Sequence, residues 1–136
     1  MKNLCVASLL IAVLIVGCKA QPVKTTGLEN GFYSITSING QTVTTYNLTV
    51  EINADKDIIS GFSGCNNYRF NYKESVSNLD LGFGVSSKMY CEDTQAIENA
   101  FFEATSRVTG FKQTKQSLEL INKEGSIEVK AVKKDK

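Results

Sequence analysis

Residues 61–72 read GFSGCNNYRFNY, and this stretch decides which fold the rest of the chain completes. In its second half Tyr68, Phe70 and Tyr72 alternate with polar residues. A period of two is typical of a β-strand. Its two glycines permit a sharp bend before that strand. The alternation alone leaves two alternatives open: the aromatic side chains lie in the core, or they line a solvent face that binds a glycan or a peptide.

The same period of two continues on both sides of this stretch. Asn39-Gly40 is a tight-turn dipeptide that follows a first strand around residues 32–35. Residues 54–57 turn the chain into a return strand over residues 58–62. The alternating apolar residues of the other predicted strands are Leu48, Val50 and Ile52; Leu79, Leu81, Phe83 and Val85; Leu118 and Leu120; and Ile127, Val129 and Ala131. Glycines among residues 79–85 indicate bulges or bends in a curved sheet.

One segment has the period of a helix. Between Asp93 and Arg107 the apolar residues recur at helical spacing, and we expect Gly110 to close the helix in a left-handed conformation. Many strands with one late helix predict an α+β fold: a curved, mainly antiparallel, barrel-like sheet with one helix packed on it.

The composition excludes several classes of function. The 136 residues include 15 Lys+Arg and 14 Asp+Glu, a balance that provides no strong field for a nucleic acid or an anionic membrane surface. The sequence has no histidine, which excludes a Ser-His-Asp site, a Cys-His site and His-ligated zinc. We expect neither a metal nor a cofactor.

The N-terminus is typical of an exported protein. Lys2 precedes an apolar run from Cys5 to Val16, which is too short to span a bilayer permanently. Residues 15–18, Ile-Val-Gly-Cys, resemble the bacterial lipobox, in which the cysteine is acylated and becomes the new N-terminus. The resemblance implies that Cys18 anchors the protein in a lipid bilayer. Lys19 stands where an aspartate signals inner-membrane retention in enteric-type lipoproteins, so an outer-membrane location is implied by analogy.

These features predict the organisation of the chain. Residues 1–17 are a lipoprotein signal peptide, 18–27 the acylated cysteine and a tether, 28–132 a folded domain, and 133–136 a charged tail. Cleavage removes 17 of the 136 residues and leaves 119.

Two of the four cysteines remain for the folded part. Cys65 and Cys91 lie 26 positions apart, and in an oxidising compartment such a pair is most simply a disulfide. A bridge of this span stabilises a domain by about 3.5 kcal/mol. A reactive single thiol is the alternative, and it would need a nearby cation such as Lys88 or Arg69.

The sequence also resembles a known family. The Gly61-Phe62-Ser63-Gly64-Cys65-Asn66 segment, Ser87-Lys88-Met89-Tyr90-Cys91, a helix with Glu98 and Phe101, and a closing Leu118-Glu119-Leu120 strand resemble the META domain of HslJ-type bacterial envelope proteins. Ser87 stands where threonine is usual, and the early tryptophan is absent. The resemblance covers about residues 27–132. It implies a lipoprotein or secreted protein, with links to stress or drug resistance, and no shared catalytic activity.

The polar residues of the first motif have two interpretations. Ser63, Asn66 and Asn67 line a ligand-binding pocket, or they form a structural turn that presents Cys65 to Cys91. The sequence favours the turn, because no base exists to activate Ser63 and the Gly-x-Ser-x-Gly pattern is absent.

We therefore expect a non-enzymatic envelope lipoprotein, a binding or stress-related module whose partner is an envelope protein or a small ligand. The alternative is an inhibitor of an exported hydrolase such as lysozyme, although the nearly neutral charge does not suit a basic partner. An enzyme ranks third: Glu92, Asp93 and Glu98 would have to gather across a cleft, whereas acidic residues at a helix start usually serve its dipole.

Overall fold

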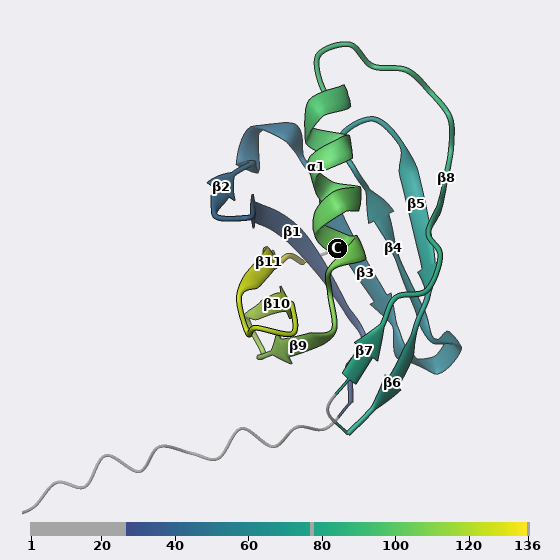
Figure 1. The fold of residues 1–136 in the computed structure, drawn as a ribbon, viewed down its shortest axis with the longest axis vertical. Coiled ribbons are helices and arrows are strands. Elements are labelled where there is room, and N and C mark those ends of the chain that lie inside the picture. Colours follow the sequence, from purple (N-terminus) through teal and green to yellow (C-terminus); the bar gives the residue numbers. More distant parts are fainter. Residues whose placement is uncertain (1–26, 77, 136) are drawn as a thin grey trace, which may run out of the picture.

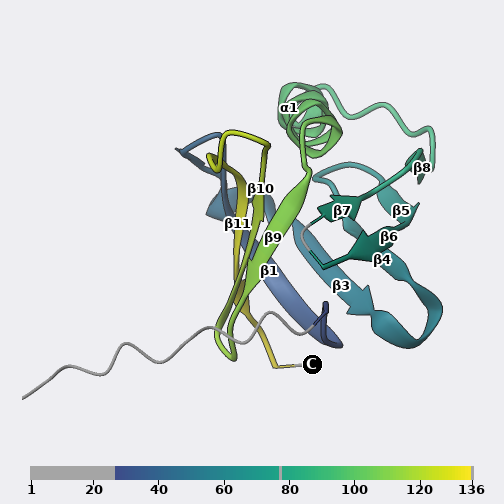
Figure 2. The ribbon, with the colours of Figure 1, turned by 60° about the horizontal axis from the view of Figure 1, so that its bottom comes forward.

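A computed structural model describes residues 27–76 and 78–135. The predicted signal peptide, Cys18 and most of the predicted tether lie outside the described residues. Within the described part the fold is α+β, as predicted: a nine-stranded antiparallel sheet, a separate two-stranded hairpin and one α-helix (Figures 1 and 2). No helix in the described part has both the length and the hydropathy that a membrane span requires.

The elements follow one another in short steps along the chain. The strands are β1 Gly31–Ile38, β2 Gln41–Thr42, β3 Thr49–Asn53, β4 Ile58–Phe62, β5 Asn67–Asn71, β6 Lys73–Ser75, β7 Asn78–Asp80, β8 Val85–Ser86, β9 Gly110–Gln113, β10 Ser117–Ile121 and β11 Ile127–Lys133. Helix α1 spans Gln95–Ser106, and short 3-10 turns cover Thr44–Tyr46 and Ala54–Lys56.

The sheet curves without closing into a barrel. Its strand order is β8-β5-β4-β3-β1-β11-β10-β9, with β2 paired to β1, so β8 and β9 are its two edges. Figure 2 shows α1 lying across the open side of the sheet, between strands β9–β11 and strands β3–β5. The β6–β7 hairpin also lies on this side, where the backbone N–H of Leu79 donates to the carbonyl of Thr109 over 2.9 Å.

The core confirms the period-two analysis at most positions. Tyr68, Phe70 and Tyr72 are each only 4% exposed, so the alternating aromatic residues of the opening stretch belong to the core. The ring of Tyr68 lies 4.7 Å from that of Phe101 on α1, centroid to centroid. Its hydroxyl donates to the backbone oxygen of Thr49, and burial raises the pKa of Tyr68 above its ordinary value.

The predicted Asn-Gly turn is confirmed by its backbone conformation. Asn39 and Gly40 have φ values of 50° and 77° and join β1 to β2. Positive φ at both central residues is what an Asn-Gly hairpin turn supplies.

The alternation fails after residue 81. Leu79 and Leu81 are buried, but Phe83 is 101% exposed and Val85 is 64% exposed, although the pattern predicted that all four share a face. Gly82, at φ +60°, redirects the chain. A Cβ at Gly84 would collide with the ring of Phe70, so the backbone itself covers that ring and the neighbouring side chains point away.

Two further expectations about the C-terminal half were wrong. Gly110 does not close the helix: α1 ends at Ser106, its C-cap residue Arg107 is in a right-handed conformation, and Gly110 begins β9. The alternation of apolar residues did not predict β9, because Phe111 is the one large apolar residue in its four positions. Ile127 is 40% exposed, because a register irregularity lies between Leu120 and Ile121, opposite the start of β11.

Candidate functional site

The Gly61–Asn66 motif covers the end of β4 and the bend that leads to β5. The backbone N–H of Ser63 donates to the carbonyl of Asn66 over 2.9 Å, and Gly64 lies at φ +104°. Cys65 within this bend forms the predicted disulfide with Cys91, their Cα atoms being 5.8 Å apart. The bend therefore reaches across to the segment that precedes α1.

Asn66 is the centre of a polar network that uses every hydrogen-bonding atom of its side chain. Its Nδ2 donates to the backbone oxygen of Met89 over 3.0 Å and to Oε2 of Glu98 over 2.9 Å. Its Oδ1 accepts from the hydroxyl of Ser87 and from the backbone N–H of Met89, each over 2.8 Å. We call the set Ser63, Asn66, Ser87, Met89 and Glu98 the Asn66 network.

Glu98 completes this network from the first turn of α1. Its Oε1 accepts from the hydroxyl of Ser63, whose Oγ lies 2.6 Å away. Ser63, Asn66 and Glu98 are 0%, 3% and 4% exposed. A buried carboxyl group is costly unless its oxygens are hydrogen-bonded, and here both are. The motif side chains therefore bind one another, which favours the structural turn over a pocket lined by Ser63 and Asn66.

Asn67, the third residue predicted for ligand binding, is exposed. It lines a shallow hollow of about 220 Å³ together with Tyr68, Arg69 and residues 85–87. Its backbone oxygen accepts from the N–H of Ser87 over 3.1 Å. Ligand binding at Asn67 stays a prediction.

The three predicted acidic residues do not share one environment. Glu98 is buried in the Asn66 network, whereas Glu92 and Asp93 are exposed before α1. In the part of the chain that the structure describes, no three side chains of Cys, Asp or Glu come together as metal ligands.

Residues 82–90 form a continuous exposed segment. Two of its residues, Ser87 and Met89, belong to the Asn66 network. Val85 and Ser86 pair with β5 as the edge strand β8, and Asn66 fixes the backbone on both sides of Met89. The apolar side chains of Phe83, Val85, Met89 and Tyr90 are 101%, 64%, 57% and 76% exposed. We call these four side chains the exposed strip.

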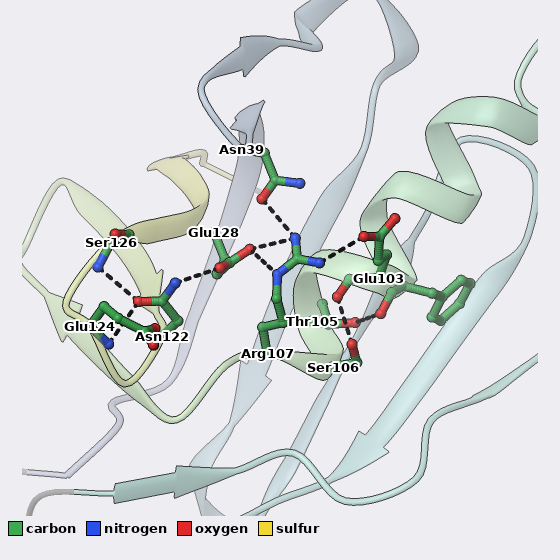
Figure 3. A network of polar contacts seen from close by, with 10 residues as sticks. Asn39, Glu103, Thr105, Ser106, Arg107, Asn122, Glu124, Ser126 and Glu128 are labelled. Carbon is green, nitrogen blue, oxygen red and sulfur yellow. Dashed lines mark hydrogen bonds and ion pairs between the residues drawn. The ribbon is translucent and has the colours of Figure 1, made fainter.

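A second polar group lies at the other end of α1, and the sequence analysis missed it (Figure 3). Arg107 bonds to Oε2 of Glu128 through Nε and Nη2 over 3.0 and 2.8 Å, and to Glu103 over 2.9 Å. Asn39 and Asn122 extend the group to two hairpin turns. We call it the Arg107 cluster.

Charge in the Arg107 cluster shifts both partners. The Arg107 guanidinium, with help from Asn122, lowers the pKa of Glu128 below its ordinary value, although burial opposes this. The hydrogen bond from Arg107 to Glu128 likewise raises the pKa of Arg107. The signal that could have found the pair is faint: Glu128 interrupts an apolar strand at a position that the structure buries to 5% exposure.

A larger polar hollow of about 600 Å³ lies where β1 and β3 meet the C-terminal residues. Its lining is charged with both signs and includes Glu51, Asp55, Lys133 and Lys134. Asn30 spans part of its floor, because it bonds to both Asp55 and the backbone N–H of Ala54. Its mixed charge suits no single class of ion.

An open antiparallel sheet, one helix across its open side and a disulfide from the β4–β5 bend to the start of that helix define a class of small α+β domains. A family model, the META domain, matches residues 26–135, and the chain belongs to that family.

Solved structures share this fold at low sequence identity. A protein from Burkholderia xenovorans, solved by NMR, is 20% identical over 80% of this chain and 85% of its own, with a TM-score of 0.60. A DUF4847 family protein from Bacteroides vulgatus, solved by crystallography, is 10% identical over 78% of this chain and 95% of its own, with a TM-score of 0.56. No curated protein matches the chain.

Proposed function

We propose that this chain is a non-enzymatic, lipid-anchored module of the bacterial cell envelope that binds a partner at the membrane. Acylation of Cys18 at the Ile15-Val16-Gly17-Cys18 motif provides the anchor, and the outer membrane is its location. The META domain is the folded part, and its partner is an envelope protein or a small ligand.

One observation carries the non-enzymatic part of the proposal. Ser63, the hydroxyl of the motif that has an acidic partner, is 0% exposed and bonds to Glu98 inside the domain. A nucleophile or a general acid must reach its substrate, and burial keeps these two groups away from one. Their arrangement instead supports a scaffold that holds the segment before α1.

The anchor is tested by metabolic labelling. Radiolabelled palmitate is expected in the wild-type protein and not in a Cys18→Ser variant. Intact mass of the mature chain should show loss of residues 1–17 and addition of acyl groups. Equal labelling of both proteins, or a mature chain that keeps Met1, would contradict the anchor.

The binding role is tested by capture with the lipidated protein in its own membranes. We expect a specific partner that is retained by the wild type. Steady turnover of peptide, glycan or ester substrates by the purified protein, abolished in Ser63→Ala, would instead show an enzyme. A link to stress or drug resistance predicts altered survival when the gene is deleted, restored by the wild type and not by Cys18→Ser.

A further inference from the structure

We infer that the exposed strip contacts the lipid surface itself, so that the domain lies against the bilayer in one orientation. This second contact rests on the proposed lipid anchor, which keeps the domain close to the membrane. It differs from the anchor because it is made by side chains of the folded domain, 65 to 72 positions after Cys18 in the chain.

The distribution of exposed apolar side chains carries the inference. Seven large hydrophobic residues of the described part are exposed, and five of them fall within residues 76–90: Val76, Phe83, Val85, Met89 and Tyr90. Single exposed apolar residues are normal on a protein surface, whereas a run of them marks a binding site. The remaining two, Ile127 and Val132, are only 40% and 42% exposed.

The Asn66 network holds this segment in place. Both backbone polar groups of Met89 bond to Asn66, Ser87 bonds to Asn66 and Asn67, and Cys91 is tied to Cys65. The backbone around Val85, Met89 and Tyr90 is therefore held, by pairing with β5 and by Asn66, while the exposed side chains of the strip project outward. A side chain presented in advance loses little further freedom on binding.

The chemistry of the segment suits a lipid interface. Residues 82–90 contain two aromatic residues, Val85, Met89 and one cation, Lys88, and no acidic residue. Aromatic rings with polar tips and lysine ammonium groups favour the level of the lipid headgroups, where apolar neighbours enter the acyl boundary. Since one cation gives little field, we expect the contact to form on zwitterionic lipid as well.

The place where the tether joins the domain is consistent with this contact. The backbone N–H of Leu28 donates to Glu74 of β6 over 2.9 Å, and β6 pairs with β7, which leads directly to the strip. Figure 1 shows the chain continuing from β7 past β8 along one margin of the sheet. Residues 18–27 span at most about 35 Å when fully extended, so the anchor keeps the β6–β7 end of this margin within that distance of the bilayer.

The test uses tryptophan as a depth reporter, because the sequence contains none. Phe83→Trp and Tyr90→Trp report on the strip, and Ile127→Trp, at an exposed apolar position on β11, is the matched control. Each mature, acylated protein is reconstituted in phosphatidylcholine vesicles with and without brominated phosphatidylcholine. Far-UV circular dichroism checks that each variant is folded, and intact mass scores acylation separately.

We expect the tryptophan emission of Phe83→Trp and Tyr90→Trp to shift to shorter wavelength and to be quenched by the brominated lipid, with no quenching in Ile127→Trp. An acylated protein whose strip reporters are not quenched would overturn the inference and leave the anchor intact. Equal quenching at all three positions would overturn the single orientation. A concentration-dependent shift without quenching would overturn the lipid contact and assign the strip to a second copy of the chain. An unacylated mature chain would overturn the anchor and this inference with it.

Discussion

The two ends of α1 are held by different chemistry. At its start the Asn66 network joins amide, hydroxyl, carboxyl and backbone groups in the interior, together with a disulfide. At its end the Arg107 cluster uses an ion pair in which the Arg107 side chain is still 39% exposed. Buried networks strongly favour one arrangement, whereas exposed ion pairs are screened by solvent. From this comparison we expect the end that carries the family motif to be the more rigid of the two.

The largest effect is expected from Asn66→Ala. The change removes four hydrogen bonds and leaves Glu98 and the backbone of Met89 unsatisfied, so the free energy of unfolding should fall by roughly 4 kcal/mol. Urea denaturation measures it. Asn67→Ala is the matched control, since its side chain is exposed, and it should change stability by less than about 0.5 kcal/mol. Similar losses for the two variants would show that the network is not the rigid element.

Removing the disulfide is the next largest change. Cys65→Ala together with Cys91→Ala opens a loop that the bridge closes over a sequence separation of 26, and the free energy of unfolding should fall by about 3.5 kcal/mol. Hydrogen exchange should rise first in residues 82–94 and stay slow at the turn of Asn122, because the Arg107 cluster remains. The wild type under a thiol reductant should show the same pattern of exchange as the double variant. A uniform loss of protection would contradict a difference between the two ends of α1.

Glu128→Gln addresses the other end of α1. An amide keeps one acceptor and turns a donor toward Arg107 or Asn122, and we expect a loss of about 2 kcal/mol at neutral pH. Because the folded-state pKa of Glu128 is lowered, its contribution is present above the unfolded-state value and is lost as the pH falls through the folded-state value. The wild type should therefore lose stability more steeply than the variant below about pH 4.5. Parallel pH profiles would show that Glu128 is not held by Arg107.

The smallest effect is expected from Phe83→Ser. This side chain is 101% exposed and does not pack in the core, so the free energy of unfolding in solution should change by less than about 0.5 kcal/mol. Leu81→Ala, two residues earlier and 4% exposed, should lose about 2–4 kcal/mol. Thermal denaturation of both variants tests this sharp boundary at Gly82, and a large loss in Phe83→Ser would show that the strip packs against the domain.

The sequence predicted the features that depend on local periodicity and turn chemistry. The strands around Val50, Ile59 and Phe70 and the Asn39-Gly40 turn follow from such patterns, and so does the helix that buries Phe101. The disulfide was predicted because two cysteines remain for the folded part and because the N-terminus predicts export to an oxidising compartment. The periodic and turn signals lie within a few residues of one another, so they can be identified without knowing the fold.

The features that the sequence did not predict depend on contacts between segments that are far apart along the chain. Phe83 continues the alternation of Leu79 and Leu81, which predicted that it is buried. The local sequence does not show that the backbone at Gly84 covers the ring of Phe70. The bond of Glu128 to Arg107 joins positions 21 residues apart, through a helix end and a strand. The motif residues Ser63 and Asn66 were identified, but their partner Glu98, 32 and more residues away, decided that they point inward.

The bridge between Cys65 and Cys91 has a consequence for proteolysis of the domain. It closes a covalent ring that includes every residue of the exposed segment 82–90. A protease that cut within this segment would open the ring without releasing a fragment, because both pieces stay joined through sulfur. Nicked protein should therefore migrate as one band without reductant and as two bands with it, so a single cut within this exposed segment cannot detach either piece of the chain.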